Sequence, residues 1–132
     1  MKFREFITKS GKLVLAGKDA ESNEKLIEQA EKAEAVLHTK EAGSPFVNIK
    51  SKENEKATKK DIKEAAIFCA RYSHDWRDNR KQVVVHYFLG KDVFKIKSTK
   101  LGTFGVKKFK EIKVKKEEIE KFINEQNPKN LK

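Results

Sequence analysis

The sequence predicts an α+β fold, a single domain with one largely antiparallel β-sheet and about three α-helices. Short segments rich in β-branched and aromatic residues recur along the chain between glycine, serine and asparagine turns. Three longer segments instead carry apolar residues at helical spacing. The 132 residues, 37% of them hydrophobic, suit one modest core, so we expect residues 1–132 to form one domain.

The expected strands follow from this composition and from the turns between them. Lys9, Ser10 and Gly11 separate the first two strands and predict a hairpin with a glycine turn. Gly43, Ser44 and Pro45 separate the next two in the same way. The strands expected span residues 3–8, 12–17, 35–39, 45–50, 82–90, 92–98 and 109–115.

The expected helices are identified by their caps and apolar faces. Asp19 is a candidate N-cap for a helix over about residues 19–33. Thr58 and Asp61 resemble a capping box that opens a second helix after a polar loop, and this helix should end near residues 73–75. A terminal amphipathic helix over about residues 116–126 follows a core of about residues 3–115.

The net charge of +11 is concentrated in one region. Residues 91–116 hold ten lysines against two acidic residues, a net of +8, whereas residues 18–41 hold four lysines against seven acidic residues, a net of −3. Such a surplus indicates an anionic partner: nucleic acid, an anionic membrane surface or an acidic protein.

Two of the expected strands alternate apolar residues with lysine. Phe94 and Ile96 alternate with Lys95 and Lys97, and Ile112 and Val114 alternate with Lys113 and Lys115. Because side chains alternate between the faces of a strand, we expect the apolar set to be buried and the lysines to form a basic face or edge. This surface would suit a phosphate backbone. The alternative is a solvated lysine surface that protects a sheet edge.

Three of the four arginines flank the one tryptophan, just after the second expected helix. Arg71, Arg77 and Arg80 offer forked donors for phosphate, and an exposed Trp76 could stack on an unpaired base. Alternatively, Trp76 packs on the core and the arginines pair with nearby aspartates. The sequence leaves both readings open.

No pattern typical of catalysis or of a metal site is present. His38, His74, His86 and Cys69 show no ligand spacing such as CxxC or HExxH. No GxSxG, Walker or GxGxxG motif occurs. Cys69 lies on the apolar helix face and is expected to be buried, and His86 is expected to be structural or at an edge. We therefore predict that the protein is not an enzyme and that it binds neither a metal nor a cofactor.

No segment of the sequence is expected to enter a membrane. No apolar run approaches the ~20 residues that a spanning helix needs. The N-terminus carries charges where a signal peptide needs an apolar region, and one cysteine excludes an internal disulfide. We expect a cytoplasmic protein without a membrane partner.

Five stretches in order resemble one known family: GKDAESNEKLI, EAVLHTKEAGS, AAIFCARYS, VVVHYFLGKDVFKIK and GTFGVKKFKEIKV. Together they are similar to the NFACT-R domain, the RNA-binding module of the ribosome quality-control NFACT proteins, here in its stand-alone single-domain form. The resemblance implies a signature polar cluster formed by Asp19, Asn23, His38, Gly43, Ser44 and Ser73. Glu34 stands where the family has Asp, and Pro45 stands where it often has a second histidine.

We therefore predict a non-enzymatic RNA-binding domain that contacts tRNA, rRNA or ribosomal particles, with a role in translation or ribosome quality control. The alternatives are an adaptor that docks its basic face on an acidic protein, or nonspecific DNA binding. His38 is expected either to organise the site or to contact RNA. The residues expected to contact RNA are Lys95, Lys97, Lys107, Lys108, Lys110, Lys113, Lys115, Arg71, Trp76, Arg77 and Arg80.

Overall fold

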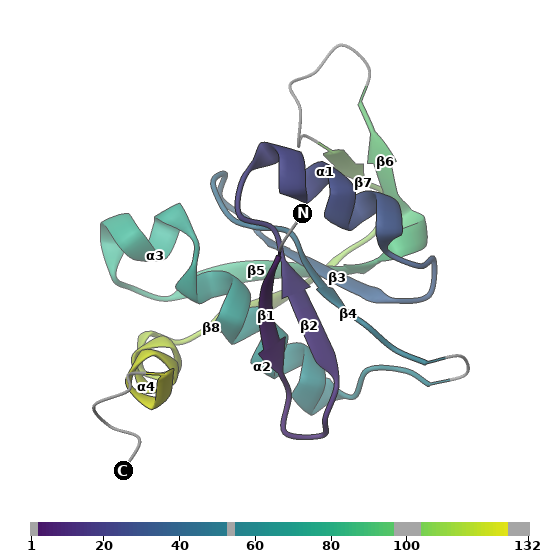
Figure 1. Ribbon diagram of the computed structural model, residues 1–132. Coiled ribbons are helices and arrows are strands. Elements are labelled where there is room, and N and C mark those ends of the chain that lie inside the picture. The colour runs from purple at the N-terminus through teal and green to yellow at the C-terminus, as the bar shows by residue number, and fades with distance from the viewer. Residues whose placement is uncertain (1–2, 53–54, 97–103, 127–132) are drawn as a thin grey trace.

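The computed structural model describes residues 3–52, 55–96 and 104–126 and has the predicted α+β architecture (Figure 1). Its strands are β1 (Arg4–Ile7), β2 (Leu13–Ala16), β3 (Ala35–Thr39), β4 (Val47–Ile49), β5 (Val83–Leu89), β6 (Val93–Lys95), β7 (Phe104–Val106) and β8 (Lys110–Val114). Its helices are α1 (Ala20–Gln29), α2 (Lys59–Arg71), α3 (His74–Asn79) and α4 (Lys116–Gln126), with a 3₁₀ turn at Gly90–Asp92. Among the described residues, no helix is long and apolar enough to cross a membrane.

The described strands form a six-stranded sheet in the order β1-β2-β4-β3-β5-β8, with every neighbouring pair antiparallel. Strands β6 and β7 pair separately as a two-stranded hairpin. Since β8 has a partner on one side only, its other edge is an edge of the sheet. The lysine-rich strand is therefore an edge strand of the sheet.

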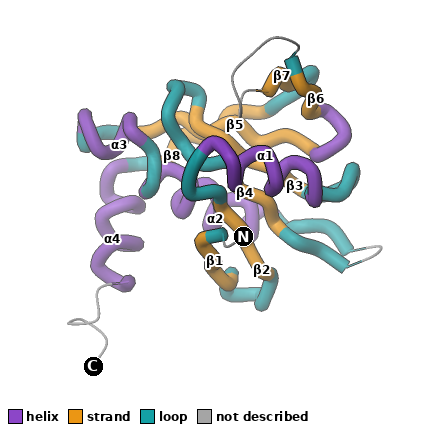
Figure 2. Tube along the Cα trace, turned by 45° about the horizontal axis from the view of Figure 1, so that its top comes forward, coloured by secondary structure: helices purple, strands orange, loops and turns teal. Residues whose placement is uncertain are grey.

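Both faces of the six-stranded sheet are covered. On one face, Leu37, Val47 and Val85 pack with the apolar side of α2 and with Ile119 of α4. On the other face, Val36 and Phe88 pack with α1 and with β6 and β7. Figures 1 and 2 show the β6–β7 hairpin beside α1, at the opposite end of the molecule from α3 and α4.

The caps expected from the sequence are confirmed. Asp19 caps α1 and accepts from the Ser22 N–H, and Thr58 and Asp61 form the capping box of α2. Helix α3 lies in a stretch for which no helix was expected. Ser73 caps it by accepting from the Trp76 N–H, and Arg80 ends it in the left-handed conformation. A helix of six residues has too short an apolar pattern to be recognised by periodicity.

The expected burial of Phe94 and Ile96 is wrong, because their side chains are 44% and 39% exposed. Strand β6 belongs to the small hairpin and not to the main sheet. Val93 packs on the α1-side core and Lys95, two residues on, reaches Glu24 of α1, so the intervening Phe94 faces outward. Lys97 lies outside the described residues. Likewise, only Phe104 and Gly105 of the glycine-containing stretch at 101–105 are described, and they belong to β7.

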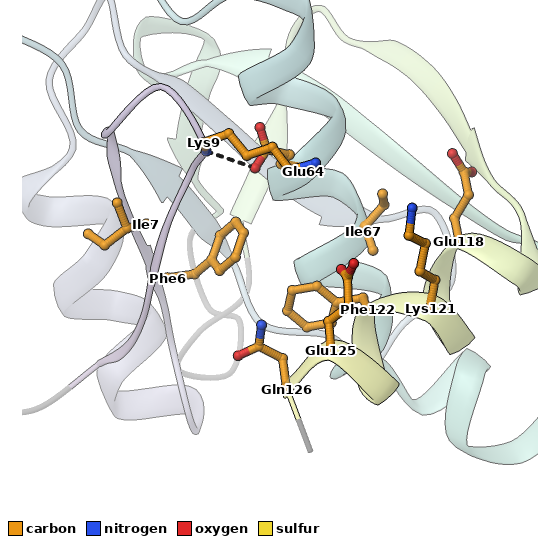
Figure 3. Close-up of a pocket in the computed structure, with 10 residues that line it drawn as sticks. All are labelled: Phe6, Ile7, Lys9, Glu64, Ile67, Glu118, Lys121, Phe122, Glu125 and Gln126. Atoms are coloured by element: carbon orange, nitrogen blue, oxygen red, sulfur yellow. Dashed lines mark hydrogen bonds between the residues drawn. The ribbon is translucent and has the colours of Figure 1, made fainter. Parts of the chain in front are cut away.

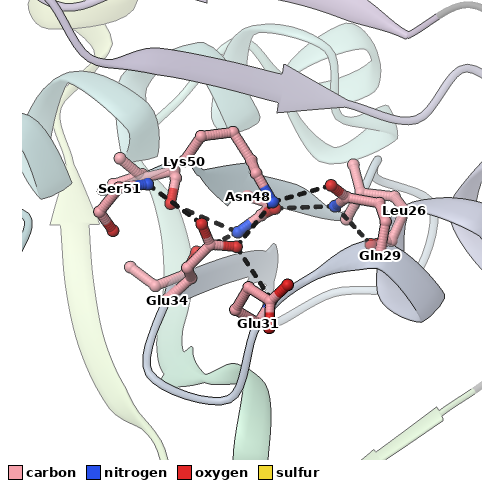
Figure 4. Close-up of polar contacts among 9 residues, drawn as sticks. Leu26, Gln29, Glu31, Glu34, Asn48, Lys50 and Ser51 are labelled. Carbon is pink, nitrogen blue, oxygen red and sulfur yellow. Dashed lines mark hydrogen bonds and ion pairs between the residues drawn. The ribbon is translucent and has the colours of Figure 1, made fainter. Parts of the chain in front are cut away.

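A buried polar network joins α1 to β3 and β4 (Figure 4). Asn48 is fully buried, donates to the Ala35 carbonyl at 3.1 Å and accepts from Gln29 Nε2 at 2.8 Å. Glu34 accepts from Lys50 Nζ at 2.8 Å and from the Ser51 N–H at 3.0 Å. Burial alone would raise the pKa of Glu34, but these donors outweigh it and hold that pKa below its usual range. The network fixes α1 against the sheet.

Asp61 connects the β1–β2 turn to α2. Its carboxylate accepts from Ser10 Oγ at 2.6 Å and from the Thr58 N–H at 2.9 Å, and Lys12 Nζ lies 3.1 Å away. Burial opposes its charge, yet these donors hold the pKa of Asp61 far below its usual range. The unfolded chain therefore binds a proton at Asp61 at a higher pH than the folded chain does. The stabilisation is present above the unfolded pKa and is lost as the solution is acidified below it.

Replacing Asp61 with Ala should therefore destabilise the protein by about 2–4 kcal/mol at pH 7, since it removes a helix cap and leaves buried donors without an acceptor. Urea unfolding monitored by circular dichroism measures the loss. Asp78→Ala is the control, because Asp78 forms an exposed ion pair with Arg77. Equal unfolding midpoints for the two variants would contradict the role given to Asp61.

Candidate nucleic-acid interface

The loop between β3 and β4 is held at each residue from Gly43 to Phe46. The Gly43 carbonyl accepts from the His74 N–H at 2.7 Å, and Ser44 Oγ accepts from the Thr39 N–H at 3.0 Å. Phe46 donates its N–H to Asn23 Oδ1 at 3.1 Å and accepts from the Gly17 N–H at 3.1 Å. The Pro45 carbonyl faces Cys69 Sγ at 3.7 Å. We call this segment the 43–46 turn.

Cys69 is buried, as expected from its place on the apolar face of α2. Burial raises the pKa of its thiol to about 12, so it stays protonated and unreactive at neutral pH. Its role is to support the turn.

The 43–46 turn lies between two hollows of the surface. The first, which we call the aromatic pocket, has a volume of about 390 Å³ and is lined by rings from three strands and the turn. The second, which we call the arginine pocket, has a volume of about 330 Å³. Both hollows are lined by Asn23, Gly43 and Ser44. The structure thus brings three of the six predicted signature residues to the wall between the two hollows.

His38 lines the aromatic pocket, with its ring 4.5 Å from that of Phe46. Burial lowers the pKa of His38, so its ring is neutral at pH 7. Its Nδ1 lies 2.7 Å from the Thr39 carbonyl. Since a carbonyl can only accept, Nδ1 carries the proton and Nε2 is an acceptor.

Two more signature residues act as helix caps. Asp19 caps α1, and the hydrogen bonds from Ser22 lower the pKa of its carboxyl. Ser73 is 2% exposed and caps α3, one residue before the His74 N–H that binds the turn. Asp19 also lines the arginine pocket, whereas Ser73 lines neither hollow. Ser73 therefore acts indirectly, because it caps the helix whose first residue, His74, binds the 43–46 turn.

The arginine pocket brings cations to one side of the turn. The cations Arg4 and Lys18 line it, together with the rings of Tyr72 and His74. The Arg4 guanidinium lies 4.3 Å from the centroid of the Tyr72 ring, and the predicted Arg71 lies 4.8 Å from that centroid. Of the ion pairs among the described residues, none includes Arg4 or Arg71. Two guanidiniums without a carboxylate partner favour an anion nearby.

On the other side of the aromatic pocket, residues from three strands form a row. His38, His86 and Glu111 occupy matching positions of β3, β5 and β8. His86 is thus in an interior strand, not at an edge, and it donates through Nε2 to Glu111 at 3.1 Å. The ring of Phe109 stacks on His86 at 4.0 Å and is 49% exposed. An exposed ring next to a sheet edge is a surface on which a base could stack.

The alternation in β8 is confirmed: Val114 is buried and Ile112 is partly buried, whereas Lys113 is exposed. Lys110 and Lys113 point to opposite faces of this edge strand, because their positions along β8 differ by three and side chains alternate between the faces. The lysines therefore line an edge and do not cover one face. Five lysines in β8 and next to it are exposed and form no ion pair with any described residue: Lys107, Lys108, Lys110, Lys113 and Lys115.

Lys95 differs from these lysines because it has a carboxylate partner. It pairs with Glu24 of α1 and lies 5.7 Å from the centroid of the Phe104 ring. Its charge is partly neutralised within the protein, contrary to the expectation of a free phosphate contact. The sequence alternation could not show this pairing, since 71 residues separate the two partners.

Trp76 is not available to stack on a base, because its side chain is 2% exposed and lies in the core beneath α3. This corrects the stacking interpretation, whereas of the expected pairing between arginines and aspartates the ion pairs among the described residues include only that of Arg77. Arg80 instead lies 5.3 Å from the centroid of the Trp76 ring. Arg77 is exposed but pairs with Asp78 at 2.8 Å. Both arginines lie on α3 or at its end, outside the two hollows.

Several residues of this surface were missed from the sequence. Phe109 precedes Lys113 by four positions, so the alternation of side chains along a strand could have predicted that both point to the same, exposed face. Arg4, Tyr72 and Lys40 gave no signal, because they come together only through the order of the strands. A further hollow between β1, α2 and α4 is a poor anion site (Figure 3). It is lined by apolar rings and by more acidic than basic side chains, namely Glu64, Glu118 and Glu125 against Lys9 and Lys121.

No group of three or more potential metal ligands converges within the described ranges. The arrangement is instead a basic sheet edge beside an aromatic hollow, the class of surface on which modules that bind single-stranded RNA operate. The model of the NFACT protein RNA binding domain matches residues 2–108. The protein therefore belongs to this family of RNA-binding domains.

A solved structure of the C-terminal part of the fibronectin/fibrinogen-binding protein from Streptococcus suis has the same fold. It matches with a TM-score of 0.78 and 22% sequence identity over 92% of this chain. The chain spans about half the length of that structure, 49%. Among curated proteins, no sequence matches this chain.

The hold on the 43–46 turn can be tested at Gly43, which has a φ of +88° and lies against the His74 ring. Gly43→Ala adds left-handed strain of about 1–2 kcal/mol and a methyl group that overlaps that ring. Gly11→Ala is the matched control, because Gly11 has a φ of +94° but open space around it. Chemical unfolding should show that Gly43→Ala loses more stability than Gly11→Ala. Equal losses would mean that the His74 contact does not hold the turn.

Proposed function

We propose that this protein binds single-stranded or looped RNA along the β8 edge, with tRNA, rRNA or ribosomal particles as targets, and that it acts by binding and not by catalysis. The observation that carries the proposal is the row of exposed, unpaired lysines from Lys107 to Lys115 next to the exposed Phe109. Lysines along an extended edge can follow successive phosphates, and an exposed ring can stack on a base.

The arginine pocket extends this surface. Arg4, Arg71 and Lys18 would bind phosphate on the far side of the 43–46 turn, where forked guanidinium donors suit phosphate oxygens. Arg77 and Arg80 remain proposed contacts at the periphery of this surface. Their helix, α3, begins three residues after Arg71, the last residue of α2. By this proposal the protein acts in the cytoplasm, in translation or ribosome quality control.

Because the described lysines are exposed, their contribution should be mainly electrostatic. If about six phosphates are neutralised, the logarithm of the binding constant should fall against the logarithm of salt concentration with a slope of about −4 to −5. Fluorescence anisotropy with a labelled oligoribonucleotide, over a series of KCl concentrations, measures this slope. An affinity that does not change with salt would contradict the proposal.

The location of the contacts is tested by two triple variants of equal charge change. Lys108→Gln, Lys110→Gln and Lys113→Gln together should weaken binding and reduce the magnitude of the salt slope by about 2–3, at about 0.7–0.9 per lost contact. Lys56→Gln, Lys59→Gln and Lys60→Gln, which change exposed lysines at the start of α2, are the control. Equal effects of the two triples would mean that net charge alone, and not the β8 edge, attracts RNA.

A nuclease treatment of the protein isolated from cells separates RNA from an acidic protein as the partner. Release of the partner by nuclease supports RNA binding. A partner that stays attached would favour docking on a protein.

A further inference from the structure

The aromatic pocket combines flat rings with polar groups. Its rings come from His38 on β3, Phe46 on the 43–46 turn, Phe88 on β5 and Phe104 on β7. Phe46 meets Phe104 edge to face at 5.5 Å and His38 at 4.5 Å. His38 and Phe88 lie on neighbouring strands of the six-stranded sheet, Phe46 lies on the hydrogen-bonded 43–46 turn, and Phe104 of the β6–β7 hairpin contacts Phe46, so the pocket is preformed. Such walls favour a flat, polarisable ligand.

Two polar side chains of the pocket, those of His38 and Asn23, supply one acceptor and one donor. The Nδ1–H of His38 is used by the Thr39 carbonyl, so its Nε2 remains an acceptor. The Oδ1 of Asn23 is used by the Phe46 N–H, so its amide NH₂ remains a donor. Within the described part of the chain, neither His38 Nε2 nor Asn23 Nδ2 has a hydrogen-bond partner. Both residues line the same hollow.

Cations lie on both sides of this pocket. Lys40 is exposed and lines it on one side. Across the shared wall of the 43–46 turn, Arg4 and Lys18 line the arginine pocket. A flat ring that carries both hydrogen-bond donors and acceptors, with a phosphate on either side, is a nucleotide within a strand.

We propose that the aromatic pocket receives one unpaired nucleobase of the bound RNA, whose edge donates to His38 Nε2 and accepts from Asn23 Nδ2. This inference deepens the proposed RNA-binding function and rests on it. The volume of about 390 Å³ lies within the range of small-ligand sites. The pocket would supply a contact that depends on the base, whereas the lysine edge supplies affinity for any phosphate backbone.

The test compares RNA with the same backbone without bases. Binding of homodecamers of rU, rC and rA, and of an abasic ribose-phosphate decamer, is measured by competition against one labelled oligoribonucleotide. Ala42→Phe places a ring at the mouth of the pocket without removing a polar group, since Ala42 is exposed and lines it. Ala33→Phe is the matched control, because Ala33 is exposed and outside the pocket.

The quantity to compare is the ratio of the affinity for the best homodecamer to the affinity for the abasic decamer. A stacked base contributes about 5- to 150-fold to affinity. The ratio should therefore fall by at least about 5-fold in Ala42→Phe and stay unchanged in Ala33→Phe. An unchanged ratio in Ala42→Phe overturns the proposal. Should that variant not fold, His38→Phe keeps a ring against Phe46 and removes the acceptor, and an unchanged ratio there also overturns it.

Two further outcomes separate this inference from the function on which it rests. If no decamer binds, the abasic one included, the RNA-binding function itself is wrong. If all decamers bind with the expected salt dependence but Ala42→Phe behaves as the control does, only the pocket assignment is wrong. The matching nucleoside monophosphates are titrated in parallel, and binding as tight as that of the decamers would make the pocket a site for free nucleotides, contrary to the proposal.

Discussion

The candidate interface depends on the 43–46 turn, where four consecutive residues are tied to four other parts of the chain. Gly43 is held by the start of α3, Ser44 by the end of β3, Pro45 by α2, and Phe46 by Gly17 and by Asn23 of α1. A loop fixed at each residue loses little further conformational entropy on binding a ligand. The two hollows beside the turn therefore have walls that are set by the fold.

The charged residues of the protein differ in whether they have a partner within the chain. Two buried acidic residues of the N-terminal half pair with lysines of the same protein, Glu34 with Lys50 and Glu24 with Lys95. The lysines of β8 and of the turn before it are left without such partners among the described residues. An edge strand must avoid pairing with other chains, and lysine serves this purpose as well as phosphate binding. The exposed Phe109 is not explained by edge protection, which favours the RNA-binding interpretation.

Much of the fold could be predicted from the sequence, because local signals decide it. The β1–β2 hairpin, the caps at Asp19 and Thr58 and the burial of Cys69 are each determined within a few residues. The site was predicted less well. The pairing of Lys95 with Glu24 depends on how the β6–β7 hairpin lies on α1, and the burial of Trp76 depends on a helix too short to show a period. Contacts between distant segments leave no local pattern.

The most direct measurement of the central claim is a map of amide chemical shifts of the isotope-labelled protein during titration with an oligoribonucleotide. The account predicts that the perturbed amides lie in residues 38–46 and 107–115, on the 43–46 turn and the β8 edge. Amides in the N-terminal half of α2, at the other end of that helix from Arg71, should stay unchanged. Perturbations confined to α2 and α4, around the hollow lined by Phe122, would contradict the account.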